Sequence, residues 1–276
     1  LGDVYKRQGA ERVAVAMSCS LVQRGALPLL PEAVRTRSAL TCGADLVFAL
    51  PAPCACAGAE AFARAGVALL AAAGCDGLVF GAETPDAALL MEAAELLDSG
   101  SYRAALKAQL AGGARSFAAA RQAAAAKLAS DERVAALLDK PNNNLAVEYC
   151  RAIRSLAPRM EAYPLPRQGA NHGEALHSAH GQFASASALR KLWAEGGADA
   201  VAPYVPEAVF PLYQEAYAAG QYTDFSAAGR CELALLRSAC RGKAPFADIR
   251  GVSEGLEHRL EAVSYTHLTL PTNSLV

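Results

Sequence analysis

The chain has 276 residues, of which 53% are hydrophobic, and a formal net charge of -1. This composition excludes a disordered chain and is sufficient for a sizeable buried core. The near-neutral charge excludes the global basic field that is typical of nucleic-acid-binding domains, although arginines gather locally between residues 151 and 190.

The two ends of the chain are expected to differ in origin from the rest. One DNA element can encode Asp3–Gln8, and its reverse complement can encode Ala262–Leu268. This element resembles the mosaic end of a transposon that is used to fragment DNA for sequencing. We therefore expect residues 1–8 and 262–276 to be derived from a sequencing adaptor and exclude them from fold reasoning. The remainder is expected to be an internal fragment of a longer chain.

The cysteines and histidines show no metal-binding pattern. The eight cysteines include no C-x-x-C pair, so we interpret them as small buried hydrophobic residues in a reducing compartment. His177 and His180 form an H-x-x-H pair near Glu174, which is too few ligands for zinc. Apolar runs fall well short of the roughly 18 residues of a membrane span. These features predict a cytoplasmic protein without a metal site or a membrane partner.

The first 80 residues alternate between strand and helix patterns. Short apolar runs predict buried parallel strands, and apolar residues at helical spacing predict the helices between them. The strands are expected at Val13–Met17, Asp45–Leu50 and Gly77–Phe80, and the helices at Glu32–Cys42 and Glu60–Ala73. This alternation predicts βαβ crossovers and a doubly wound parallel sheet. Ligands bind such sheets beyond the carboxyl ends of the strands, which here are marked by Ser18, Pro51 and Gly81.

The second half of the chain is mostly helical in pattern. The alanine-rich residues 85–138 predict an insertion of two or three helices with a break at Gly112–Gly113. After Pro141, the side chains of Asn142–Asn144 can cap a helix that continues over Leu145–Leu156. Further elements are expected as a strand at Met160–Leu165 and helices at Pro206–Tyr217, Ala227–Cys240 and Ser253–Leu260.

The stretch F-A-S-A-S-A-L-R-K at Phe183–Lys191 is a candidate phosphate site. Ser185 suits the N-cap of a helix, Ser187 falls in the first turn, and Arg190 follows one turn later on nearly the same face. The first turn of a helix carries unpaired N–H groups and the positive end of the helix dipole, so it favours an anion. The same pattern also starts helices that bind nothing, so other motifs must support this prediction.

Six motifs occur in a fixed order along the chain. They are Q-R-G at Gln23–Gly25, V-F-G-A-E at Val79–Glu83, P-N-N at Pro141–Asn143, A-Y-P-L-P-R at Ala162–Arg167, A-S-A-S-A-L-R-K at Ala184–Lys191 and E-G-L-E-H-R-L at Glu254–Leu260. This ordered series resembles the tRNA(Met) cytidine acetate ligase family of bacterial nucleotidyltransferase-like proteins. A series of motifs is far more specific than any one of them.

The resemblance implies an α/β fold. It predicts a Rossmann-like, HUP-type nucleotidyltransferase sheet that is parallel and lacks its first strand, in an ATP-binding domain over residues 9–200. A helical insertion at about 85–138 and a helical C-terminal region at 201–261 would complete it. The implied reaction uses ATP, with Mg²⁺, to activate acetate as acetyl-adenylate and then acetylates N4 of the wobble cytidine of elongator tRNA(Met). Acetate and this tRNA are the implied partners, and DNA is not.

The resemblance also implies which residues contact ATP. They are Gly81, which lets ATP approach the strand end, Asn142 of P-N-N, Arg167, and the phosphate-binding set Ser185, Ser187 and Arg190. Without the resemblance, Gly81 is a turn glycine, Asn142 is a helix cap and Arg167 is a surface charge. No Ser-His-Asp set is required, because adenylate formation depends on holding the triphosphate and stabilising its charge.

The chain also departs from the family pattern. Family members carry an H-x-G-H motif whose histidines bind the ATP phosphates, and this motif is absent from the 276 residues, so we expect the fragment alone to be inactive. Ala26-Leu27 replaces a usual Glu-Pro, Glu32-Ala33 a usual Lys-Trp, and Ala49 a usual glutamate. Two alternatives therefore stay open. One is an adenylyltransferase of a small metabolite, and the other is a non-catalytic RNA-binding scaffold.

Overall fold

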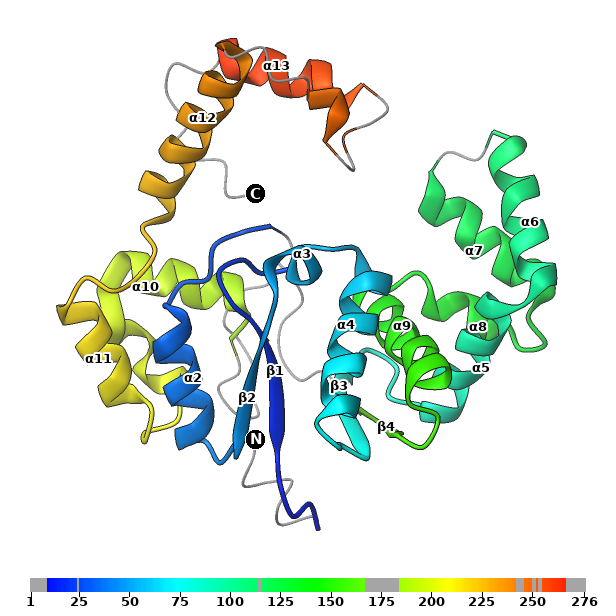
Figure 1. The fold of residues 1–276 in the computed structure, drawn as a ribbon, viewed down its shortest axis with the longest axis horizontal. Helices are drawn as coiled ribbons and strands as arrows, with labels where there is room; N and C mark the ends of the chain where they lie inside the picture. The colour runs from blue at the N-terminus through cyan, green and yellow to red at the C-terminus, as the bar shows by residue number, and fades with distance from the viewer. Residues whose placement is uncertain are drawn as a thin grey trace.

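The computed structural model describes residues 9–23, 25–113, 116–166, 184–241, 246–249, 252 and 255–266 (Figure 1). Its strands are β1 (Ala14–Ser18), β2 (Leu46–Leu50), β3 (Gly77–Ala82) and β4 (Glu161–Pro166). Its longer helices are α2 (Glu32–Thr41), α4 (Ala59–Ala72), α5 (Ala87–Asp98), α6 (Gly100–Ala111), α7 (Phe117–Leu128), α9 (Pro141–Leu156), α10 (Ala186–Val201), α11 (Phe210–Ala218), α12 (Phe225–Arg241) and α13 (Leu256–Thr266). Short helices are α3 (Ala52–Ala55), α8 (Glu132–Leu137) and the 3₁₀ turns Ala202–Tyr204 and Phe246–Asp248.

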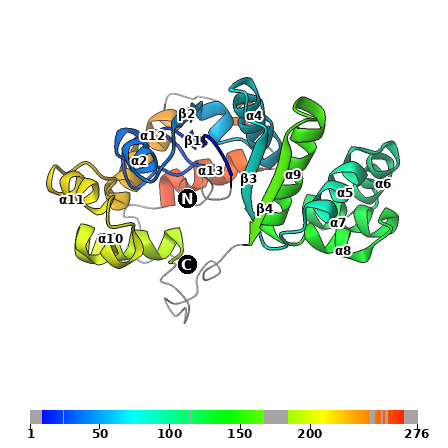
Figure 2. The same cartoon turned by 90° about the horizontal axis from the view of Figure 1, so that it is seen from below.

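The described strands form two parallel pairs rather than one sheet. β1 pairs with β2 from Ala14 opposite Leu46 onward, and β3 pairs with β4 from Gly77 opposite Glu161. Both views place β1 and β3 on the inside, with β2 and β4 outside them (Figures 1 and 2). The α/β fold with parallel strands is therefore confirmed. The described strands of one pair make no ladder with those of the other, and the additional first strand stays a prediction.

The strands are less buried than their apolar sequences predict. Leu46 is 51% exposed and Tyr163 is 49% exposed, and in β3 the exposed residues Val79 and Gly81 alternate with buried ones. This alternation shows that only one face of the β3–β4 pair is covered by the described residues. α9 packs on both strands of that pair and α5 packs on β4, while α4 packs on β1 and β2. The prediction of strands that are buried on both faces is wrong for this part of the chain.

The alanine-rich insertion contains four helices, α5 to α8, instead of the predicted two or three. Asp86, Ser99, Ser116 and Asp131 each accept a hydrogen bond from a backbone N–H in the first turn of the helix that they precede. Each of these caps starts a new helix, because it satisfies an N–H group that has no partner within the helix. The predicted break at Gly112–Gly113 separates α6 from α7.

Two apolar clusters hold the described residues together. The larger one joins α4, α5 and α9 to β3, and its fully buried side chains include Val67, Leu90, Val147 and Ile153. The smaller one joins α10 and α11 to α2 around Trp193, which is 3% exposed. α12 and α13 extend away from both clusters (Figure 1). No helix among the described residues is long and apolar enough to cross a membrane.

The cysteines correct another expectation. Of the eight cysteines, only Cys150 is buried, while Cys231 on α12 is exposed. Burial raises the pKa of the Cys150 thiol to about 12, which agrees with a small core residue. Cys231 differs because α12 packs against little else in the described part of the chain, so most of its surface faces solvent.

Candidate functional site

The loop that follows β3 is bound to the first turn of α9. Glu83 Oε1 accepts hydrogen bonds from Asn142 Nδ2 at 2.6 Å and from Asn142 N at 3.2 Å. Glu83 Oε2 accepts a third from Asn143 N at 2.7 Å. These bonds bring Gly81, at the end of β3, and Asn142 to the same corner of the fold, although they lie about 60 residues apart in the sequence.

A reciprocal pair of bonds closes this corner. The Asn143 side chain is 1% exposed; its Oδ1 accepts from Thr84 N at 2.9 Å, and its Nδ2 donates to Thr84 Oγ1 at 3.1 Å. Glu83 therefore binds the backbone of α9, while Asn143 binds the backbone of the loop. Because each segment satisfies polar groups of the other, the loop and the helix start form one rigid unit.

The prediction that Asn142–Asn144 cap α9 is wrong. The helix begins at Pro141, so the three asparagines lie in its first turn, and the residue before it, Lys140, makes no side-chain cap. Asn144 Nδ2 donates backward to Leu138 O at 2.8 Å instead of accepting from the helix. Glu83 serves as the cap from a distant segment, and proline at the first helical position needs no N–H partner.

The protonation of Glu83 is expected to control this cap. Burial raises the pKa of Glu83, but hydrogen bonds from Asn142 and Asn143 outweigh burial and hold the pKa below its usual value. The stabilisation is thus complete above the ordinary carboxyl pKa of about 4.3 and is lost as the pH falls through the lower folded-state pKa. We expect Glu83→Gln to lower the free energy of unfolding by about 0.5 to 2 kcal/mol at pH 7. Urea unfolding at several pH values should show this difference shrinking below pH 4, and a constant difference would contradict it.

The α10 helix starts as its sequence predicts. Ser185 is the N-cap and its Oγ accepts from Ala188 N at 3.2 Å, while Ser187 is exposed in the first turn. The Arg190 guanidinium lies 5.9 Å from the ring centre of Phe225 at the start of α12. Arg190 thus contacts the C-terminal helices as well as lying one turn from Ser187.

The predicted site residues fall into two groups. Gly81 near the end of β3 and Asn142 at the start of α9 belong to segments that Glu83 bonds together, whereas Ser185, Ser187 and Arg190 lie at the start of α10, where Arg190 contacts Phe225. Arg167 and the histidines at 177 and 180 lie outside the described residues. The sequence shows Glu83 only as the last residue of the V-F-G-A-E motif. Its role as the cap of α9 could not be predicted, because no local spacing points to a helix that starts 58 residues later.

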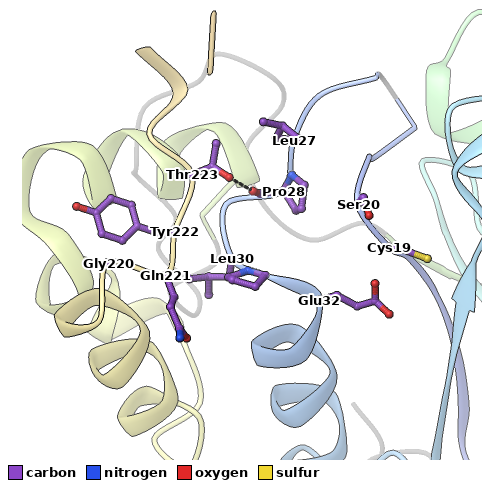
Figure 3. A pocket seen from close by; sticks show the side chains of 11 residues that line it. Cys19, Ser20, Leu27, Pro28, Leu30, Glu32, Gly220, Gln221, Tyr222 and Thr223 are labelled. Atoms are coloured by element: carbon purple, nitrogen blue, oxygen red, sulfur yellow. Dashed lines mark hydrogen bonds between the residues drawn. The ribbon is translucent and has the colours of Figure 1, made fainter. Parts of the chain in front are cut away.

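A cavity of about 400 Å³ lies beyond the carboxyl end of β1 (Figure 3). Its walls come from the loop after β1, the start of α2 and the linker between α11 and α12. Thr223 joins two of these walls, since its Oγ1 donates to Pro28 O at 2.6 Å. Of the predicted ATP residues, those that the structure describes do not line this cavity, and the Glu32 carboxylate points toward Cys19 and Ser20. A carboxylate at this position disfavours phosphate, so we do not assign the triphosphate here.

Arg35 fixes the shape of this region. Its Nη1 donates to Ser18 O at 2.8 Å and its Nε to Leu30 O at 3.0 Å, and its Nη2 also donates to Cys19 O. The guanidinium therefore binds the end of β1 to the turn before α2. An arginine that is used this way holds backbone and is occupied by three carbonyl groups.

The sequence matches the family model described as HIGH Nucleotidyl Transferase over residues 1–271, and the chain belongs to this family. Within it, curated relatives share the name that the motifs suggested. A tRNA(Met) cytidine acetate ligase of Syntrophotalea carbinolica is 35% identical over 94% of this chain and 60% of the relative. Proteins of the same name from Caldanaerobacter subterraneus subsp. tengcongensis and a Thermoanaerobacter species are 33% and 32% identical. The resemblance to tRNA(Met) cytidine acetate ligases is thereby confirmed.

Solved structures agree with the sequence relatives. The apo structure of Thermotoga maritima TmcAL matches with a TM-score of 0.86 at 28% identity, over 96% of this chain and 63% of that one. The structure of the same protein bound with alpha-thio ATP matches with a TM-score of 0.80 at 27% identity, over 95% of this chain and 63% of that one. The chain spans 60% to 67% of the length of the three relatives named above.

Proposed function

We propose that this chain forms the ATP-binding part of a ligase that acetylates N4 of the wobble cytidine of elongator tRNA(Met). The observation that carries the proposal is the β3–α9 corner, where Gly81 and Asn142 are held together by Glu83. Support comes from the relatives, which are named tRNA(Met) cytidine acetate ligase, and from the related structure with a bound ATP analogue. The proposed ATP contacts are Gly81, Asn142, Arg167, Ser185, Ser187 and Arg190.

In the proposed reaction, a carboxylate oxygen of acetate attacks the α-phosphorus of ATP. The bond to the β-phosphate oxygen breaks, so pyrophosphate leaves and acetyl-adenylate forms. The N4 amine of cytidine then attacks the acetyl carbon, AMP leaves with the bond electrons, and the amine loses a proton. Catalysis of this kind requires orientation and charge stabilisation, which backbone N–H groups, serines and arginines supply.

Magnesium is expected to enter with the nucleotide. No three His, Cys, Asp or Glu side chains gather into a metal site among the residues that the structure describes. The Glu83 carboxylate already accepts three hydrogen bonds, so it is poorly placed to bind a cation. Oxygen atoms of the triphosphate itself would therefore be ligands of Mg²⁺, which would neutralise part of their charge during adenylate formation.

The phosphate side of the proposed site needs more than these residues. The chain contains no H-x-G-H motif, and we propose that such a segment, encoded upstream of Gly9, completes the site. Reading the gene upstream of Gly9 tests this part. A strand followed by H-x-G-H would support catalysis, and an upstream strand without the motif would favour the non-catalytic RNA-binding scaffold.

The activity itself can be tested on the full-length protein that the gene encodes. We expect AMP, pyrophosphate and N4-acetylcytidine to form in equal amounts when ATP, acetate and elongator tRNA(Met) are all present. A tRNA with uridine at the wobble position is the control, because it lacks the N4 amine and should remain unmodified. If ATP consumption is indifferent to tRNA, the ligase proposal is wrong and the metabolite adenylyltransferase is favoured.

A further inference from the structure

We infer that Glu83 is a positioning residue of the proposed ATP site and acts by holding the carboxamide of Asn142 in one orientation. This inference rests on the proposed function, which assigns Asn142 to ATP. Neither the family motifs nor the fold gives Glu83 a role. Its carboxylate connects the β3 end, where Gly81 lies, with the first turn of α9, where Asn142 lies.

The orientation follows from the chemistry of the two side chains. Asn142 Nδ2 donates to Glu83 Oε1 at 2.6 Å, a charge-assisted hydrogen bond. If the carboxamide turned over, Asn142 Oδ1 would face the carboxylate, and two acceptors that carry negative charge would repel each other. Glu83 therefore determines which atom of Asn142, Oδ1 rather than Nδ2, is directed away from the carboxylate.

The backbone bonds keep Glu83 itself in place. Its two oxygens accept from Asn142 N and Asn143 N, so the carboxylate cannot rotate without leaving helix N–H groups unsatisfied. The buried Asn143 side chain fixes the loop backbone at Thr84 from the other direction. Because both ends are fixed, the position of the Asn142 side chain is set before any ligand binds, and a preorganised contact loses less entropy on binding.

Glutamine at position 83 changes the orientation of the Asn142 carboxamide without changing the size of the side chain at position 83. It has the size of glutamate, but one of its two polar atoms is an NH₂ group. It can therefore no longer accept from all three donors of Asn142 and Asn143. Its NH₂ group can also donate to Asn142 Oδ1, which permits the reversed carboxamide. Glu83→Gln thus removes the orientation of Asn142 while the loop and helix can still associate.

The test measures the affinity for MgATP in the full-length protein by calorimetry in a double-mutant cycle. We expect Glu83→Gln to weaken binding about fivefold to tenfold, and Asn142→Ala to weaken it at least as much. If Glu83 acts through Asn142, the double variant binds as Asn142→Ala does, within about twofold. Asp86→Ala is the matched control, because it removes a helix cap from the same loop, which Asp86 Oδ1 makes with Leu89 N, and should leave ATP affinity unchanged.

Each outcome decides between the alternatives. Wild-type affinity in Glu83→Gln would overturn the inference while leaving the ATP site in place. Multiplying effects of the two substitutions, or an equal loss in Asp86→Ala, would show a merely structural role and would also overturn it. If the wild-type protein does not bind ATP at all, the proposed function fails first, and the inference fails with it.

Discussion

Replacing Glu148 by alanine is expected to lower the free energy of unfolding by about 3 to 5 kcal/mol, the usual cost of breaking a buried ion pair. Glu148 lies on α9 and is 4% exposed. Its Oε1 contacts Arg121 Nη2 of α7 at 2.5 Å, and its Oε2 contacts Arg151 Nη1 at 2.7 Å. Without the carboxylate, Arg121 loses this ion pair in a largely buried place, whereas Arg151 keeps the Asp98 carboxylate at 2.8 Å. Urea unfolding followed by far-UV circular dichroism measures the loss.

The control for this experiment is an exposed ion pair. Lys191 Nζ and Glu195 Oε1 of α10 are 3.9 Å apart, and both side chains are exposed. Glu195→Ala should change the free energy of unfolding by at most about 0.5 kcal/mol, because solvent screens such pairs. If Glu148→Ala costs no more than Glu195→Ala, the network does not hold the helical insertion against α9 as we argue.

Gly197→Ala is expected to lower the free energy of unfolding by about 2 to 6 kcal/mol, because it adds backbone strain and overpacking to the smaller apolar cluster around Trp193. Gly197 interrupts α10 with φ +68° and ψ -155°, a conformation that is essentially restricted to glycine. A Cβ there would meet the Tyr217 ring at 2.5 Å. Tyr217 in turn packs edge-on against Trp193, with ring centres 5.5 Å apart. Trp193 is the only tryptophan of the chain, so its fluorescence during urea unfolding reports this cluster directly.

Gly220→Ala separates the two causes. Gly220 also has a positive φ of +66°, but a Cβ there meets no atom within 4 Å. It should cost only about 1 to 2 kcal/mol, which is the backbone strain without the overlap. Equal losses for the two variants would mean that the Tyr217 contact contributes nothing to the effect at Gly197.

Much of the fold could be predicted from local sequence. The four strands and the start of α10 at Ser185 lie within a few residues of their predicted positions, because apolar runs, helix caps and glycine breaks act over one turn or one strand. The prediction of the helical insertion was less accurate. Alanine favours helix throughout residues 85–138, and the number of helices depends on the caps at Asp86, Ser99, Ser116 and Asp131, which the composition does not show.

The candidate site was predictable only in part. The motifs predict that Gly81 and Asn142 contact ATP. They also led us to expect Asn142 as a helix cap, and they predicted no role for Glu83. Arg190 was expected to face phosphate one turn from Ser187, and the structure also places it against Phe225. These contacts join segments 35 to 60 residues apart, and local propensity carries no information about such distances.

The sequence by itself determined the positions of the strands and the family, and it predicts which residues contact ATP. Those properties depend on short motifs and on apolar periodicity, which are local to each segment. The tertiary structure alone decided that a carboxylate after β3 caps α9 and orients Asn142, and that Glu148 binds two arginines between helices. The physical reason is that a buried polar group must find its partner wherever packing brings one within about 3 Å, at any separation along the chain.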